Sequence, residues 1–88
     1  MKVEYNIDVL KPHQPSNDML ARALKKVEGA KFVCIKTDEI DEKTRSIFVK
    51  IVGTEELTIE NIKEELSSFN CSLHSLDEVT ILDDDWEQ

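Results

Sequence analysis

The residue types best suited to chemistry lie in two short segments, residues 8–16 near the start of the chain and residues 74–79 near its end. These segments contain both histidines, His13 and His74, and the carboxylate of Asp8. One carboxylate and two imidazoles can hold Zn²⁺, Ni²⁺ or Fe²⁺ and leave coordination positions open. We therefore expect a divalent metal ion, of a kind that the sequence does not define, at Asp8, His13 and His74.

Further carboxylates form a secondary group of candidate ligands, because Ca²⁺ and Mg²⁺ prefer several oxygen atoms. They are Asp38, Asp41, Glu42 and Glu78. The stretch from Asp38 to Glu42 lacks the spacing and the glycine of a calcium-binding loop, so a solvated turn is the simpler interpretation. Asp77 and Glu78 are neighbours on a predicted strand and point to opposite faces, so they cannot chelate one ion together without a bulge.

A structural role for the same side chains is the alternative. His13 would then cap a proline-containing turn, and His74 would lie on a solvated face of a sheet. Asp8 would accept a hydrogen bond from a loop amide or pair with Lys11. The spacing of these residues matches no established metal motif, so the sequence leaves both interpretations standing.

The pattern of apolar residues predicts six elements that would position these side chains. Alternating apolar and polar residues indicate a first strand, which Pro12 and Pro15 end because a proline cannot donate to a ladder. Ser16 and Thr58 are suitable N-caps for two helices, and Gly29 and Asn70 are suitable stops. The predicted elements are a strand from Val3 to Leu10, a helix over 17–27, strands over 32–40 and 45–52, a helix from Ile59 to about Phe69, and a strand over 71–82.

This order of elements, β-α-β-β-α-β, predicts an α+β fold, the ferredoxin-like sandwich. Right-handed crossovers and a central hairpin place four strands in one antiparallel sheet, with both helices on one face. The first and third strands are then central, and the second and fourth are edges. We expect this domain to span residues 1–82, followed by an acidic tail over residues 83–88.

The predicted topology brings the candidate ligands to one end of the sheet. The first strand ends there, the fourth strand begins there, and the acidic hairpin turns there. Asp8 and His74 would be cross-strand neighbours on the face without helices, with His13 in the loop just beyond.

The fourth strand contains a conflict of parity. Leu73, Val79 and Ile81 fall on one face of a regular strand, whereas Leu76 falls on the other. A β-bulge near residues 75–77 would resolve the conflict, and bulges often occur beside functional sites. Otherwise Leu76 is an exposed apolar residue on the edge.

Composition restricts the classes of partner. The chain has 88 residues and a formal net charge of −8, with 19 acidic and 11 basic residues, which disfavours nucleic acid and favours cations and basic surfaces. The lysines at 25, 26 and 31 form only a small cluster, mixed with Glu28. The chain has no apolar run of membrane-spanning length, no signal core at its start and no Cys-x-x-Cys pair, so we expect a cytoplasmic protein without a membrane partner.

Three segments, Asp8–Ser16, Val27–Ala30 and His74–Val79, closely resemble an archaeal family known only as domain of unknown function 211. The similarity runs in register from about Tyr5 to Ile81. The resemblance implies a ferredoxin-like fold and a tendency to form homo-oligomers, and it brings no activity or catalytic residues. The cysteine-bearing stretch Asn70–Ser72 and the aspartate-rich, tryptophan-bearing end depart from the family pattern.

These features favour a small non-catalytic protein that forms a closed homo-oligomer and binds a divalent cation or small ligand near the end of the first strand. Subunits would meet through edge strands, or through an apolar patch on the open face made by Phe48 with Leu10 and, where it lies on that face, Leu76. Trp86 would anchor the tail to a neighbouring subunit or to this open face. An adaptor that docks other proteins through its edges and acidic surface is the alternative. An enzyme with a site shared between subunits is less well supported, because the chain lacks a nucleophile elbow and a phosphate-binding glycine loop.

Overall fold

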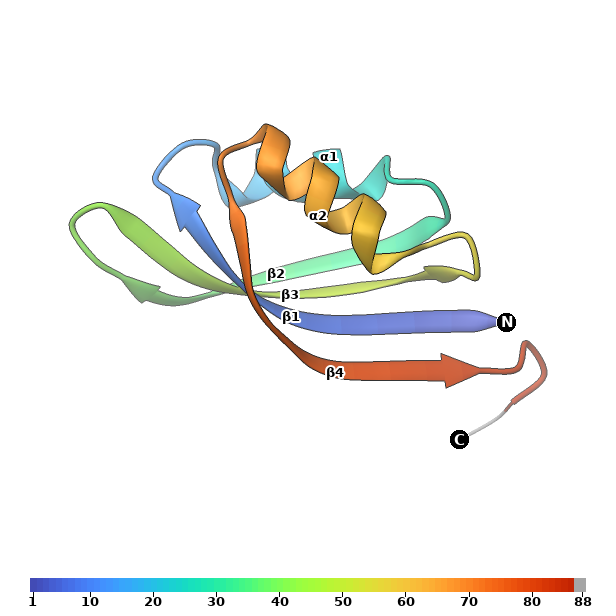
Figure 1. The fold of residues 1–88 in the computed structure, drawn as a ribbon. Coiled ribbons are helices and arrows are strands. Elements are labelled where there is room, and N and C mark those ends of the chain that lie inside the picture. The colour runs from blue at the N-terminus through green and yellow to red at the C-terminus, as the bar shows by residue number, and fades with distance from the viewer. Residues whose placement is uncertain (87–88) are drawn as a thin grey trace.

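The computed structural model describes residues 1–86 and contains the six elements in the predicted order (Figure 1). The strands form one antiparallel sheet in the order β2-β3-β1-β4, and both helices cover one face of it (Figure 1). The predicted ferredoxin-like α+β fold is therefore confirmed, with β1 and β3 in the centre. The elements are β1 (Lys2–Pro12), α1 (Asn17–Lys25), β2 (Ala30–Ile40), β3 (Thr44–Thr54), α2 (Ile59–Ser68) and β4 (Ser72–Leu82).

The element boundaries lie within two residues of the predicted ones. β1 continues past the predicted end to Pro12, where the missing N–H is tolerated because Pro12 is the last residue of the ladder and pairs with Thr44. The predicted helix caps are confirmed: Ser16 Oγ accepts a hydrogen bond from the Met19 N–H at 3.1 Å, and Thr58 Oγ1 accepts one from the Asn61 N–H at 3.2 Å.

The core lies between the sheet and the two helices. Its buried members are Ile7, Val9, Leu20, Leu24, Ala30, Ile47, Val49, Ile51, Leu57, Ile62, Leu66 and Cys71. Gly29, at a φ of 86°, turns the chain from α1 into β2, and its carbonyl accepts a hydrogen bond from the Thr54 N–H at 2.9 Å. A Cβ atom on Gly53 would collide with that same carbonyl, so this contact between the turn and β3 requires glycine.

β4 contains two extra residues relative to β1. His74 and Asp77 have no partner in the register, which shifts between Asp8 and Val9 and again between Asn6 and Ile7. The predicted bulge near residues 75–77 is confirmed, and a second irregularity occurs at His74. Because directly opposed residues share a face, the two shifts place four of the five apolar residues of β4 on the helix-facing side, and Leu82 is the exception. The pairs are Leu73 with Val9, Leu76 with Ile7, Val79 with Tyr5 and Ile81 with Val3.

Three of these apolar residues remain exposed although they lie on the helix-facing side. Leu76 is 42% exposed, Val79 48% and Ile81 51%. β4 is an edge strand and bends away from the helices toward its C-terminal end (Figure 1). We call these three residues the apolar row.

Neither helix within residues 1–86 has the length and apolar character needed to span a membrane.

Candidate functional site

Lys11 anchors the loop that carries His13. Its side chain is buried, and its Nζ atom donates to the carbonyl oxygens of Pro12 at 2.9 Å, His13 at 3.4 Å and Pro15 at 2.5 Å. Burial lowers the pKa of the Lys11 ammonium, and the guanidinium of Arg45 lowers it further. The expected pairing of Lys11 with Asp8 is wrong, because residues three apart on a strand point to opposite faces.

His13 fastens this loop to the β2–β3 hairpin. Its Nε2 atom lies 2.9 Å from the backbone carbonyl oxygen of Glu42, and its Nδ1 atom lies 3.4 Å from Arg45 Nε. Arg45 can only donate, so Nδ1 accepts and Nε2 carries the proton that bonds the carbonyl. Both ring nitrogens are therefore occupied, and a metal could bind His13 only by displacing one of these partners.

Asp8 and His74 do not form the predicted cross-strand pair. Asp8 lies opposite Ser75 in β4, because His74 is the extra residue between Ser75 and Leu73. The Asp8 carboxylate is half-buried and accepts a hydrogen bond from Ser46 Oγ at 3.1 Å. His74 is exposed on the edge strand.

The secondary candidates have separate roles. Asp38 lies at a register shift in β2, where the pairing steps from Thr37 to Glu39. Asp41 Oδ1 accepts from the Lys43 N–H at 3.3 Å, which shapes the hairpin turn. The side chain of Glu42 is exposed, and its contact with His13 uses the backbone.

Glu78 lies on the open face, away from that hairpin. Its Oε1 atom accepts from Asn6 Nδ2 at 2.9 Å. In the described part of the chain, no three His, Cys, Asp or Glu side chains lie close enough to hold one metal ion. A metal site at Asp8, His13 and His74 stays a prediction.

The face of the sheet without helices is polar. Asn6 donates to both Glu4 and Glu78, and Lys50 Nζ lies 3.7 Å from Glu4 Oε2. Phe48 is exposed on this face, as predicted, and pairs with Asp8 across β1. A hollow of about 380 Å³ there is lined by Asn6, Ile7, Cys34, Lys36, Phe48, Val49, Lys50 and Asp77.

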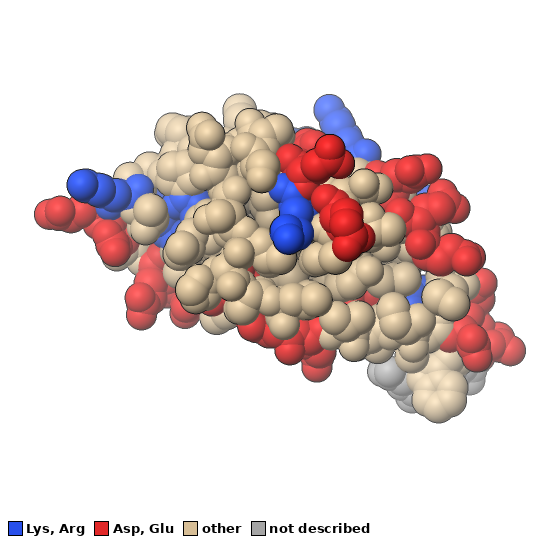
Figure 2. Space-filling model, viewed as in Figure 1, with Lys and Arg blue, Asp and Glu red and all other residues tan. Residues whose placement is uncertain are grey.

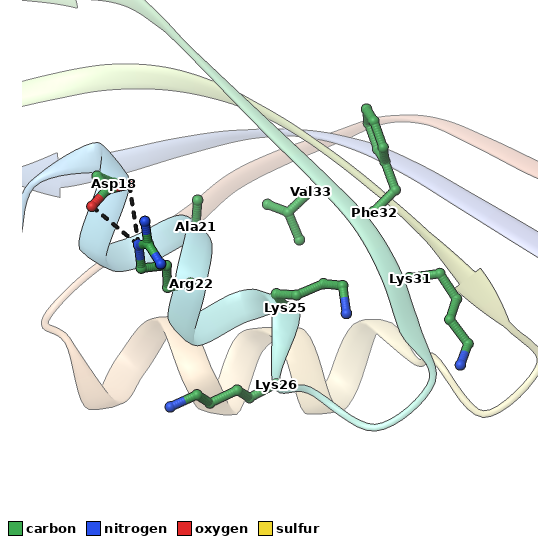
Figure 3. Close-up of a pocket in the computed structure, with 8 residues that line it drawn as sticks. All are labelled: Asp18, Ala21, Arg22, Lys25, Lys26, Lys31, Phe32 and Val33. Atoms are coloured by element: carbon green, nitrogen blue, oxygen red, sulfur yellow. Dashed lines mark hydrogen bonds and ion pairs between the residues drawn. The ribbon is translucent and has the colours of Figure 1, made fainter.

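A larger hollow, of about 660 Å³, lies between α1 and the edge strand β2 (Figure 3). We call it the basic groove. Figure 3 shows Lys25 extending from α1 toward β2. The one carboxylate of the groove, Asp18, is paired with Arg22 at 3.2 Å. The lining residues are Asp18, Ala21, Arg22, Lys25, Lys26, Lys31, Phe32 and Val33.

The predicted mixing of Glu28 with the lysine cluster is wrong. Glu28 instead lines a separate hollow with Val27, Asn61, Glu64 and Glu65. The basic groove therefore carries four cationic side chains against one carboxylate.

Residues 83–86, which we call the acidic turn, follow the end of β4. The Trp86 N–H donates to the Asp83 carbonyl at 3.1 Å, and Asp84 Oδ1 lies 2.6 Å from the terminal amine of Met1. The hydrogen bond to Asp84 raises the pKa of that amine. Trp86 is 60% exposed and lines a hollow of about 430 Å³ on the open-face side, together with Lys2, Glu4, Lys50, Glu78, Thr80 and Leu82.

The two edges of the sheet differ in the charge of the side chains beside them. Figure 2 shows acidic side chains at both ends of the molecule and an uncharged band between them, in the region of β4 in Figure 1. The apolar row lies on this strand, with the acidic turn just beyond it. At the opposite edge, the basic groove lies beside β2.

The profile of the uncharacterised ArCR family, domain of unknown function 211, matches residues 4–84. The chain belongs to this family. The similarity extends to an uncharacterised protein of the archaeon Methanocaldococcus jannaschii, which is 36% identical over 73 residues, covering 83% of this chain and 74% of that protein. The family resemblance seen in the sequence is thereby confirmed. The match includes Lys11 and His13 as well as the whole of β4.

Proposed function

We propose that this protein is a non-catalytic module that assembles with copies of itself through the edges of its sheet. The apolar row on β4 is the observation that carries the proposal. A long edge strand offers unpaired backbone groups, and an exposed apolar row beside it favours a partner strand with an apolar surface. Burying the exposed half of each side chain would contribute roughly 1 kcal/mol per residue.

The open face of the sheet supports association less well. Lys50, Glu4, Asn6 and Glu78 form a connected polar network there, and Asp77 and Lys36 line the neighbouring hollow. Packing two such faces together would remove charged groups from water, which costs free energy unless every group finds a partner. The exposed Phe48 alone does not offset this cost, so we place the interface at the edges.

The experiment measures the mass of the assembly by size-exclusion chromatography with light scattering. We expect the wild-type protein to exceed the 10.1 kDa monomer mass, and Val79→Glu to shift it toward that mass, because the substitution puts a charge within the apolar row. Met19→Glu is the matched control, since Met19 is an exposed apolar residue on α1.

A wild-type protein that remains monomeric at the highest concentration measured would contradict the proposal. The adaptor function would then be favoured, because the same free edges would be available to a strand of another protein. Equal loss of mass in Met19→Glu and Val79→Glu would also contradict the placement of the interface at β4.

A further inference from the structure

The two edges of the sheet are complementary in charge. The edge at β4 ends in the acidic turn, and the carboxylates of Asp83 and Asp85 have no partner within the described residues 1–86. The edge at β2 is flanked by the basic groove, whose rim holds Arg22, Lys25, Lys26 and Lys31. In a chain of net charge −8, this groove is a local reversal of sign that suits an acidic partner.

Both edges are also apolar on the same side of the sheet. The apolar row of β4 faces the helix side, because its residues oppose the buried face of β1. The basic groove has Ala21 and Val33 among its lining residues, and it lies on the helix side as well, between α1 and β2. A β4 strand laid along β2 would therefore bring apolar groups together beneath the charged rim.

The directions of the strands allow β2 of a second copy to pair with β4 in antiparallel orientation. All neighbouring strands are antiparallel, and there are four of them, so β2 and β4 run in opposite directions. A second copy in the same orientation can thus add its β2 to β4 and continue an antiparallel sheet. The start of β2 and the end of β4 lie in the same row across the sheet. Gly53 pairs with both Ala30 and Val3, and Val3 pairs with Ile81.

Regular backbone is present at the end where the contact is needed. The irregularities of β4 occur at His74 and Asp77, which leaves Glu78–Leu82 in regular register. In β2, the stretch from Phe32 to Thr37 is regular. Edge bulges hinder pairing between chains, so these two stretches are the parts of the edges able to pair.

We propose that β4 and the acidic turn of one copy dock along β2 and the basic groove of the next copy, in a head-to-tail assembly. This inference rests on the proposed self-association and adds its direction and its ionic contact. Each copy uses β4 to contact one neighbour and β2 to contact the other, so the contact is heterologous. It generates a ring when the rotation between successive copies closes.

Pairing between identical edges is disfavoured by charge. Two β4 strands would place the acidic side chains of Asp77 and Glu78 from both copies along one interface. Two β2 strands would bring together two rims of lysine and arginine. Like charges directly opposed across strands are destabilising.

The test uses two variants with reversed charge. The groove variant carries Lys25→Glu, Lys26→Glu and Lys31→Glu, and the turn variant carries Asp83→Lys and Asp85→Lys. All five positions are exposed, and circular dichroism verifies that both variants fold. We expect each variant alone to associate at least ~10-fold more weakly than the wild type, because its edges repel each other.

An equimolar mixture of the two variants is expected to associate more strongly than either variant alone, because both contacts then pair opposite charges: the acidic turn of one variant meets the basic groove of the other, and the reversed pair also matches. The control carries the same three-charge reversal outside the groove and outside both edge strands, Lys43→Glu, Lys50→Glu and Lys63→Glu, and should retain far more of the wild-type mass than the groove variant.

Each outcome has a separate meaning. If the wild type assembles and both variants keep its mass, the ionic contact is overturned while self-association stands. If both variants dissociate and their mixture associates no more strongly than either variant alone, the head-to-tail direction is overturned. A monomeric wild type would overturn the proposed function itself.

Discussion

His13 connects two loops that lie far apart in the sequence, with one ring nitrogen on the Glu42 carbonyl and the other on Arg45. These are the partners expected of a structural histidine. A ligand role would require that one of the two be given up when the ion binds. The two roles predict different results: a structural role affects the stability of the metal-free protein, whereas a ligand role makes the stability depend on added metal.

We predict that His13→Ala lowers the free energy of unfolding by about 1 kcal/mol in metal-free protein, because the Glu42 carbonyl loses its donor. Urea denaturation measures this, with the exposed neighbour Gln14→Ala as control. The same variants are then titrated with Ca²⁺, Zn²⁺, Ni²⁺ and Fe²⁺ while thermal stability is followed. Stabilisation of the wild type that disappears in both His13→Ala and Asp8→Ala would establish the metal site and contradict a purely structural role.

Lys11 is buried although it is charged, and the pattern of the first strand indicates this position. The alternation of Val3, Tyr5, Ile7 and Val9 continues to position 11, which is therefore on the buried face. The charge of a lysine favours an ion pair with Asp8, whereas its position in the pattern determines the face on which it lies. Its carbonyl partners are Pro12 at the end of β1 and His13 and Pro15 in the loop that follows, and no periodicity predicts their arrangement.

At the scale of elements, β4 is the strand whose geometry was hardest to predict. A single bulge brings Leu76 onto the face of Val79 but leaves Leu73 on the other side. Two extra residues, His74 and Asp77, are required to place Leu73, Leu76, Val79 and Ile81 on one face. The spacing of the apolar residues along β4 thus implies two irregularities. The positions of the helix caps and turns, in contrast, follow directly from Ser16, Gly29 and Thr58.

We predict that deletion of Asp77 preserves the fold. Glu78 and Leu76 already pair with the consecutive residues Asn6 and Ile7, so removing the extra residue makes this ladder continuous. The expected change in unfolding free energy is within about 1 kcal/mol, and nuclear Overhauser contacts between Tyr5 and Val79 should persist.

The control for this prediction is deletion of Asn6 from the central strand β1, which would shift the register against both neighbours and should prevent folding. Loss of structure on deleting Asp77 would mean that the bulge is needed for the sheet to form.

At the scale of the whole molecule, charge is arranged in a way that counting residues did not reveal. Lys25, Lys26 and Lys31 were predicted to be mixed with Glu28, but the fold turns Glu28 toward α2 and leaves the groove basic. The topology followed from the order of elements. The sign of each surface depends on which side chains the packed helices bring together, and this is a property of the tertiary structure.

Trp86 allows the assembly to be followed directly, because it is the one tryptophan of the 88-residue chain. It is 60% exposed in the isolated subunit and belongs to the acidic turn. We predict that its emission moves to shorter wavelength as the wild-type protein is concentrated, since docking against a neighbour removes the indole from water. Val79→Glu should keep the long-wavelength emission, and identical spectra across all concentrations would contradict the prediction.

The proposed head-to-tail contact between β4 and β2, the two edge strands, also determines how an assembly can stop growing. An open row of subunits, whatever its length, always keeps one bare edge of each kind, and these two bare edges attract each other. An open row can therefore bind further subunits, whereas a closed ring has no free edge and stops growing. A single subunit with a disabled β4 edge would act as a terminator, so a small proportion of such subunits should shorten every row into which it is incorporated.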